Sequence, residues 1–238
     1  MLGLIWPGAQ ARAGRTAHPR VAIVFEHAGV SLNDLEPIYA MHEPFGLGIF
    51  PHQRYSAAIA RDAAAHGLTP MLHLPLESVR PADVGPVTGV VWTRMSDAEI
   101  RRTVEGDLAT VPGIAGVSSH AGSRATADRR VMTVVLHVIK AHGLWFQENR
   151  TTPDSVALDV ARAGGIRSVL VTTYLDDPPT GIDAKVVALL NTAVRRGWAV
   201  AGAHITTGAP EIVARHLDEF RGAGVVFVPI TEFLAGNH

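Results

Sequence analysis

The sequence contains no cysteine. This absence excludes disulfide bonds, thiolate metal ligands and a cysteine nucleophile. Tyrosine and tryptophan are scarce, at 3 and 4 residues, whereas there are 12 histidines. Because histidine is the commonest protein metal ligand and a frequent general base, the positions of these histidines carry more information than their number.

The chain also lacks an excess of charge of either sign. Its formal net charge is -1, so no basic face of the kind that binds nucleic acid is expected. No segment reaches the ~18 continuous apolar residues of a membrane-spanning helix. With 238 residues and 47% hydrophobic residues, the chain is long and apolar enough to bury a substantial core, as a globular domain does.

The first residues allow two interpretations. A short apolar run at residues 1–6 precedes Ala9-Gln10-Ala11, which resembles the end of an export signal with a small-residue cleavage site. The run is short and no positively charged region precedes it, so a plain disordered arm is the alternative. We therefore expect residues 1–19 to be an N-terminal arm or signal remnant. A periplasmic or secreted protein is the expectation, with a cytoplasmic one as the alternative.

From residue 20 onward, short aliphatic segments alternate with amphipathic ones, which predicts a parallel sheet with crossover helices, either open or closed into a barrel. One domain over residues 20–238 is the simplest organisation. The predicted strands are Val21–Phe25, Gly46–Phe50, Pro70–His73, Ile114–Ser118, Leu144–Gln147, Ser168–Thr172, Ala199–His204 and Val225–Pro229. The predicted helices are Tyr55–His66, Ser96–Thr110, Thr126–His142, Asp183–Arg196 and Pro210–Arg221. Residues 77–93 show no periodicity and are expected to form a long loop at the substrate side of the sheet.

Polar residues recur directly after the predicted strands. They are Glu26, His27, His52, His73, His120, Glu148, Arg150, Asp176, Asp177 and His204. The carboxyl ends of parallel strands share one rim in a barrel, and active sites lie there. Histidines and carboxylates meeting at such a rim are what a divalent metal and a general base require. Taken singly, each of these residues is as readily explained by a structural hydrogen bond or a turn, so the prediction depends on their recurrence.

Five segments together resemble the divergent polysaccharide deacetylases, in the order of that family and over about residues 19–234. They are Phe25-Glu26-His27-Ala28-Gly29, His73-Leu74-Pro75-Leu76-Glu77, Ser119-His120-Ala121-Gly122-Ser123-Arg124, Glu148-Asn149-Arg150-Thr151-Thr152 and Ala203-His204. The family carries paired aspartates where this chain has Glu26 and His27, and an aspartate where it has Glu148. The resemblance implies a single-domain α/β fold, an irregular (β/α) barrel with about seven parallel strands.

The resemblance also implies a metal-dependent hydrolase that removes acetyl groups from a glycan. We expect a divalent ion, zinc by preference, among His27, His120 and His204, with His73 as a further candidate ligand or a substrate contact. Glu26 or Glu148 would take the proton from water, and Arg150 would orient a carboxylate. Substrate contacts are expected from Ser123, and from Trp92 as a stacking surface in the long loop.

Two other classes of function remain open on the sequence alone. The altered acid pair at Glu26 and His27 is compatible with a catalytically degenerate barrel that binds a glycan or a cell-envelope partner. A metal-dependent amidohydrolase acting on small molecules also fits histidines at strand ends, although the order of the motifs does not favour it. The metal content of the purified protein separates the enzyme from the binder.

Overall fold

The computed structural model describes residues 18–171 and 173–234. The predicted N-terminal arm lies almost entirely outside the described residues. The strands are β1 (Arg20–Ala28), β2 (Gly46–Ile49), β3 (Thr69–Leu76), β4 (Gly116–Ala121), β5 (Trp145–Glu148), β6 (Ser168–Leu170), β7 (Trp198–His204) and β8 (Val226–Phe227). The helices are α1 (Glu36–Met41), α2 (Ser56–Ala65), α3 (Asp97–Thr110), α4 (Arg129–Ala141), α5 (Ala157–Ala163), α6 (Ile182–Arg196) and α7 (Ala209–Gly222).

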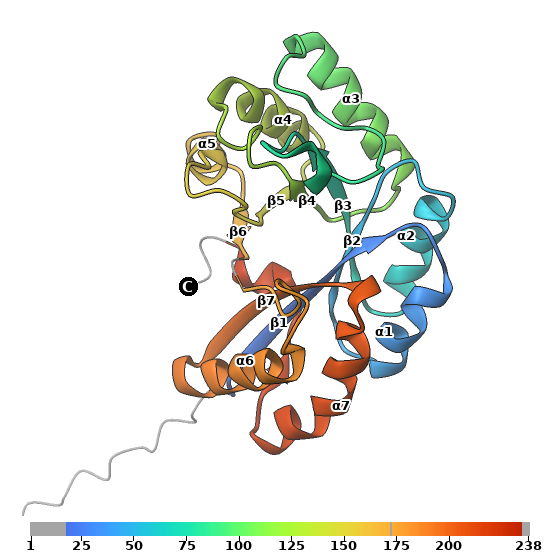
Figure 1. Ribbon diagram of the computed structural model, residues 1–238, viewed down its shortest axis with the longest axis vertical. Coiled ribbons are helices and arrows are strands. Elements are labelled where there is room, and N and C mark those ends of the chain that lie inside the picture. The colour runs from blue at the N-terminus through green and yellow to red at the C-terminus, as the bar shows by residue number, and fades with distance from the viewer. Residues whose placement is uncertain (1–17, 172, 235–238) are drawn as a thin grey trace, which may run out of the picture.

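The strands form one curled parallel sheet. Their order is β6-β5-β4-β3-β2-β1-β7, and β8 pairs with β1 beside this path. Beyond β6, Tyr174 forms an isolated parallel bridge to Gly202 of β7, which links the two edges of the curled sheet. The sheet and its surrounding helices make a single (β/α) half-barrel domain, as the sequence predicts (Figure 1).

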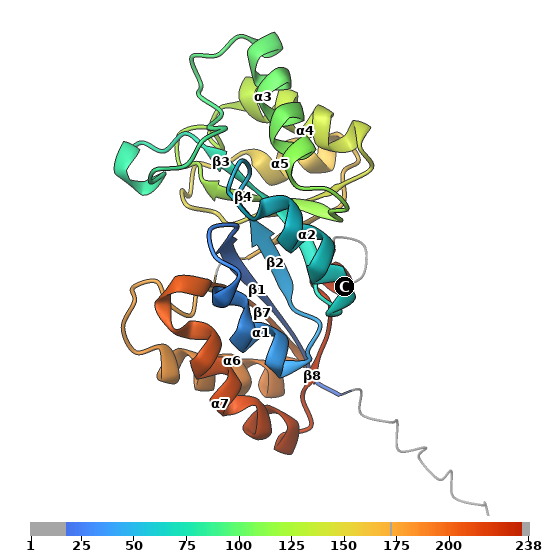
Figure 2. The same cartoon turned by 90° about the vertical axis from the view of Figure 1, so that its right-hand side faces the viewer.

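The helices cover the outer face of the sheet. Figure 2 shows α3, α4 and α5 grouped at one end of the molecule and α6 and α7 at the other. Their apolar faces and alternate strand residues, such as Ile23 and Leu72, form one large buried cluster. The opposite strand residues, such as Val24, Met71 and Trp145, form a smaller cluster inside the curled sheet. Because successive side chains of a strand point to opposite faces, this division fixes which residues can reach the interior of the barrel.

The predicted strands and longer helices are all present, with ends shifted by a few residues. The helix start at Ser96 is confirmed as a capping box: the Ser96 backbone N–H donates to Glu99 Oε2 at 2.7 Å, and the Glu99 N–H donates to Ser96 Oγ at 3.4 Å. Two short helices, α1 and α5, were not anticipated because six or seven residues are too few to show a helical period. Among the described residues, no helix has both the length and the apolar character needed to cross a membrane.

The segment at residues 77–93 is irregular apart from one 3-10 turn at Pro81–Asp83 and an isolated parallel bridge between Val91 and Leu76, as expected for a long loop. Its two ends are tied to each other, because the backbone N–H and the hydroxyl of Thr93 both donate to Glu77 Oε2 at 2.6 Å. The hydroxyl of Ser123, which follows β4, accepts a hydrogen bond from the Val79 N–H at 3.0 Å. We call residues 77–93 the long loop; these contacts hold it against the carboxyl ends of β3 and β4.

Candidate functional site

A β-bulge at the end of β1 brings two adjacent side chains to the same place. The register between β1 and β2 shifts between Phe25 and Ala28, and His27 has a φ of 75°. Such left-handed backbone is rare for residues other than glycine, and bulges re-aim side chains near active sites. As a result both Glu26 and His27 line one cavity, although neighbours in a regular strand face opposite ways.

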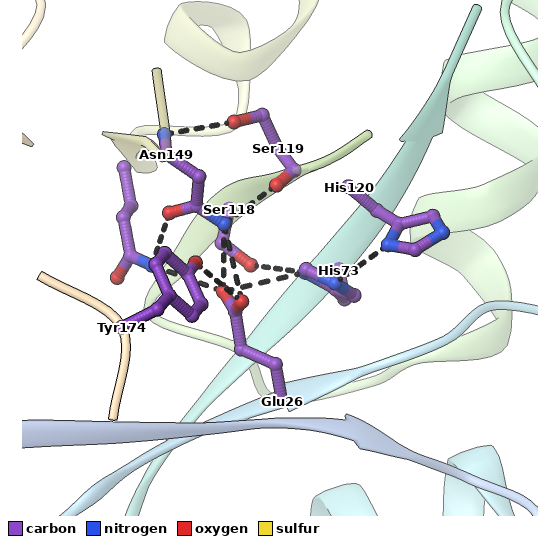
Figure 3. Close-up of polar contacts among 8 residues, drawn as sticks. Glu26, His73, Ser118, Ser119, His120, Asn149 and Tyr174 are labelled. Carbon is purple, nitrogen blue, oxygen red and sulfur yellow. Dashed lines mark hydrogen bonds and ion pairs between the residues drawn. The ribbon is translucent and has the colours of Figure 1, made fainter. Parts of the chain in front are cut away.

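Glu26 lies at the centre of a buried hydrogen-bond network inside the barrel (Figure 3). Its Oε1 accepts hydrogen bonds from Gln147 Nε2 and Asn149 Nδ2, both at 3.0 Å. Its Oε2 accepts one from the Tyr174 hydroxyl at 2.7 Å and a second from Asn149 Nδ2 at 3.2 Å. Gly48 of β2 leaves room for this side chain, since a Cβ there would lie 3.1 Å from Glu26 Cγ. Burial raises the pKa of Glu26, and the hydrogen bonds from Asn149 and Tyr174 oppose that rise.

Three histidines converge above Glu26. One ring nitrogen from each of His27, His73 and His120 lies within 4.8 Å of the others. His73 Nε2 is 3.1 Å from His120 Nδ1, while Nε2 of His27 is buried and has no hydrogen-bond partner among the described residues. An orphaned buried nitrogen beside two facing ring nitrogens is an arrangement that a bound cation would complete.

The surroundings set the tautomers of two of these rings. His120 Nε2 lies 3.0 Å from the carbonyl oxygen of Val84, which can only accept, so Nε2 carries the hydrogen and Nδ1 keeps a lone pair. His73 Nδ1 lies 2.8 Å from Ser118 Oγ and 3.5 Å from Glu26 Oε1. The nearby carboxylate favours a hydrogen on Nδ1 of His73, so Nε2 of that ring carries a lone pair and no hydrogen. In this tautomer the two ring nitrogens, 3.1 Å apart, can both offer a lone pair to a cation.

All three rings are neutral at neutral pH. Burial lowers the pKa of His27 to about 3 and that of His120 to about 4, and it lowers the pKa of His73 well below its ordinary value. The Phe50 ring supplies part of this apolar setting, with its centroid 4.9 Å from that of His27 and 4.8 Å from that of His120. Neutral imidazoles are the form that binds metal ions.

His204 occupies a different position in the site. Its ring centroid is 4.2 Å from that of His27, and its Nδ1 faces Asp176 Oδ1 at an ion-pair distance of 3.2 Å. Asp176 is fixed in turn by the backbone N–H of His204 at 2.6 Å and by the Thr207 hydroxyl. Burial would lower the pKa of His204, but the hydrogen bond and charge of Asp176 raise it above its ordinary value. The geometry thus separates three neutral rings from one carboxylate-paired ring.

A cavity of about 810 Å³ opens above these groups. Its floor is formed by Glu26 and the histidines, and its walls carry hydroxyl side chains such as Ser78, Ser123 and Thr152 together with charged ones such as Arg80 and Asp177. Ser123, which we predict to contact the substrate, lines the cavity, and its hydroxyl also hydrogen-bonds Ser78 at 2.8 Å. The size and polarity of the cavity suit a hydroxyl-rich ligand.

Three predicted site residues do not reach the floor of the cavity. Glu148 follows Gln147 on β5, so it points to the outer face; its Oε1 accepts the Arg150 N–H at 2.8 Å and it does not line the cavity. The side chain of Arg150 lies exposed at the mouth, and the structure shows it holding no carboxylate among the described residues. The Arg94 guanidinium lies over the Trp92 ring, with its Cζ atom 4.9 Å from the Trp92 ring centroid. Trp92 does not line the cavity.

Several residues of the site were not anticipated. Gln147, Ser118 and Tyr174 lie on the inner face and contact Glu26 or His73, whereas Asp176 was expected at the rim without an assigned partner. For Gln147 and Ser118 a signal exists, since each lies two residues from another interior position of its strand. Using that signal requires knowing which face of the sheet is the interior, and both faces of these strands are buried.

The fold and the position of the site define a deacetylase-type (β/α) barrel. The family model of the divergent polysaccharide deacetylases matches residues 23–234, and the chain belongs to that family.

An uncharacterized protein of Haemophilus influenzae is 29% identical over 190 residues, covering 79% of this chain and 67% of that protein. The crystal structure of an uncharacterized protein from Agrobacterium tumefaciens C58 has a TM-score of 0.80 at 22% identity, covering 95% of this chain and 91% of that one. A family 4 acetyl xylan esterase from Clostridium thermocellum, solved with a cobalt ion, has a TM-score of 0.51 at 15% identity, covering 90% and 89%. At these identities the two structures show the fold.

The residues present fit a divalent metal ion. Three neutral nitrogen donors converge, one of them without any other partner, and imidazole suits zinc and cobalt better than magnesium or calcium. The described cluster that could hold an ion contains His73 in place of the predicted His204.

Proposed function

We propose that the protein is a metal-dependent deacetylase acting on an acetylated glycan. The observation that carries this proposal is the convergence of three neutral histidines beside the carboxylate-paired His204 at the floor of one polar cavity. His27, His73 and His120 would hold the ion, with zinc our preferred identity. When bound, it would polarise the acetyl carbonyl and supply an activated water.

His204 would donate the proton that the leaving group needs. In the reaction, water adds to the acetyl carbon and releases its proton to the solvent, the bond from that carbon to the glycan nitrogen or oxygen breaks, and acetate leaves. The released nitrogen or oxygen needs a proton. Nδ1 of His204 is held by Asp176, so Nε2 is the nitrogen able to donate that proton from the cavity side. The raised pKa of His204 keeps a larger fraction of the ring protonated for this step.

The substrate class follows from the shape and lining of the cavity. Hydroxyl groups of Ser78, Ser123 and Thr151 offer hydrogen bonds to sugar hydroxyls. The acetylated glycan of the Clostridium thermocellum relative, a xylan ester, is one member of the class to test. Acetamido sugars are the other.

The test pairs metal analysis with product analysis. Purified protein reconstituted with zinc should hold one ion per chain and release acetate from at least one acetylated oligosaccharide in a panel of esters and amides. The variant His120→Ala should keep its circular dichroism spectrum and lose both properties. Full metal occupancy in that variant would contradict the assignment.

A second function is favoured by one observation. Both oxygens of Glu26 are occupied by donors, so the carboxylate expected to be the base is not free. A glycan-binding barrel without catalysis is consistent with this. Protein that binds zinc and an acetylated oligosaccharide, but releases no acetate at any pH between 5 and 9, would establish the binder.

A further inference from the structure

The donors around Glu26 leave it no free lone pair toward the cavity. Gln147 and Asn149 donate to Oε1, and Tyr174 and Asn149 donate to Oε2. A carboxylate has about four lone-pair sites. Asn149 Nδ2 gives one hydrogen to the Ser119 carbonyl and shares the other between the two oxygens of Glu26. Together with Gln147, Tyr174 and the Ser118 hydroxyl, this makes four donors around the carboxylate. A general base must accept a proton within hydrogen-bond reach of the attacking water, and Glu26 would have to give up one of these buried donors to do so.

The same carboxylate is placed to act on His73. Its Oε1 is 3.5 Å from His73 Nδ1, and the Ser118 hydroxyl lies 2.8 Å from that nitrogen while also hydrogen-bonding Glu26. Both groups lie on the Nδ1 side of the ring, and the opposite nitrogen, Nε2, faces His120. Carboxylates in this position fix the tautomer and orientation of a ligating histidine and strengthen it as a donor.

We infer that Glu26 is a positioning residue that orients His73 through Nδ1 and Ser118, and that it does not accept the proton of the attacking water. The inference rests on the proposed metal site, with His73 as one of its ligands. Glu26 then takes no part in proton transfer. That leaves the pair of His204 and Asp176 as the proton-transfer group on the cavity floor.

The experiment separates affinity for zinc from turnover. Zinc affinity is measured by competition with a chromophoric chelator. The proteins compared are the wild-type chain, Glu26→Gln and Ser118→Ala. The kcat for acetate release is then measured for each of them at saturating zinc. Asp107→Asn is the matched control, since Asp107 is also a buried carboxylate beside a histidine, 2.8 Å from His52 Nε2, but lies outside the cavity. Circular dichroism and thermal melting establish that each variant folds.

The expected result is a loss of zinc affinity of about 10–100-fold in Glu26→Gln, the usual effect of removing a partner of a metal ligand, with kcat at saturating zinc within about tenfold of wild type. Ser118→Ala should weaken zinc in the same direction, and Asp107→Asn should not change it. If Glu26→Gln does not fold, Ser118→Ala decides: unchanged zinc affinity in that variant overturns the inference.

An unchanged zinc affinity in folded Glu26→Gln also overturns the inference. So does a fall in kcat of about 10²–10⁴-fold at saturating zinc, which is the contribution of a general base. A wild-type chain that binds zinc but releases no acetate contradicts the proposed catalysis alone, because the comparison of zinc affinities still decides the role of Glu26. A wild-type chain that binds no zinc overturns both.

Discussion

His120 Nε2 donates a hydrogen bond of 3.0 Å to the carbonyl oxygen of Val84, so a candidate metal ligand and the long loop are joined by one contact. The loop also supplies one wall of the cavity through Ser78, Val79 and Arg80. A metal ion on Nδ1 of His120 requires the hydrogen to stay on Nε2, and this strengthens the bond to Val84. Binding of the ion and ordering of the cavity wall are therefore coupled.

This coupling predicts slower amide exchange in the long loop when zinc is bound. Hydrogen–deuterium exchange of residues 78–90 should fall on zinc addition, because opening the loop then breaks a contact to an occupied ligand. The outer surface of α6, remote from the cavity, is the internal reference and should not change. Equal exchange of the loop with and without zinc would contradict the coupling.

The pairing of Asp176 with His204 predicts a pH effect of defined sign. The carboxylate raises the pKa of His204, so Asp176→Asn should lower that pKa toward or below its ordinary value of 6.5. If protonated His204 donates to the leaving group, the alkaline limb of kcat/KM moves to lower pH in this variant. Titration of the His204 ring by NMR gives the same pKa independently of turnover. A pKa unchanged by the substitution would exclude Asp176 as its cause.

A second buried carboxylate predicts how stability changes with pH. Burial raises the pKa of Asp107 to about 8, from an ordinary 3.8. The folded chain therefore holds this proton more tightly than the unfolded chain, and stability is lost as pH rises from about 4 to about 8, by on the order of 1 kcal/mol per pH unit. The Asn side chain of Asp107→Asn does not titrate. The unfolding free energy of this variant, measured by urea unfolding at several pH values, should therefore not show this decrease between about pH 4 and about pH 8. Parallel pH profiles for wild type and variant would show that Asp107 stays ionised when folded.

The close packing of Gly202 in β7 against Tyr174 predicts that a larger residue at position 202 destabilises the fold. A Cβ at this position would lie 2.7 Å from the ring of Tyr174, whose hydroxyl holds Glu26. Gly202→Ala should cost about 1–3 kcal/mol of unfolding free energy through overpacking, and it should weaken zinc binding by displacing Tyr174. Gly222→Ala is the matched control, because a Cβ there meets nothing within 4 Å. Equal stabilities of the two variants would contradict the packing argument.

Short-range patterns in the sequence could predict the parallel sheet with crossover helices, and the resemblance to the deacetylase family implies the barrel. Buried aliphatic strands, the capping box at Ser96 and glycines after helices are each visible in a few residues. The rim of histidines follows from the parallel topology, since carboxyl ends of strands meet. His27, His120 and His204 were expected together, and their rings do lie together.

The roles within the site could not be assigned in the same way, because they depend on which face each side chain takes. Glu148 and Gln147 are equally buried, and only the direction of curling decides that Gln147 faces inward. The bulge at His27 overrides strand alternation and has no signal in the local sequence. His73 and His204 differ only in their partners, Ser118 and Asp176, which are far from them in sequence.

The choice of third ligand gives the most direct test of this account. Zinc affinity should be measured by isothermal titration calorimetry for His73→Ala and His204→Ala, beside the wild-type chain. The account predicts one zinc per wild-type chain, a loss of at least about 100-fold in His73→Ala and affinity close to wild type in His204→Ala. Loss of zinc in His204→Ala, with His73→Ala still binding, would contradict it.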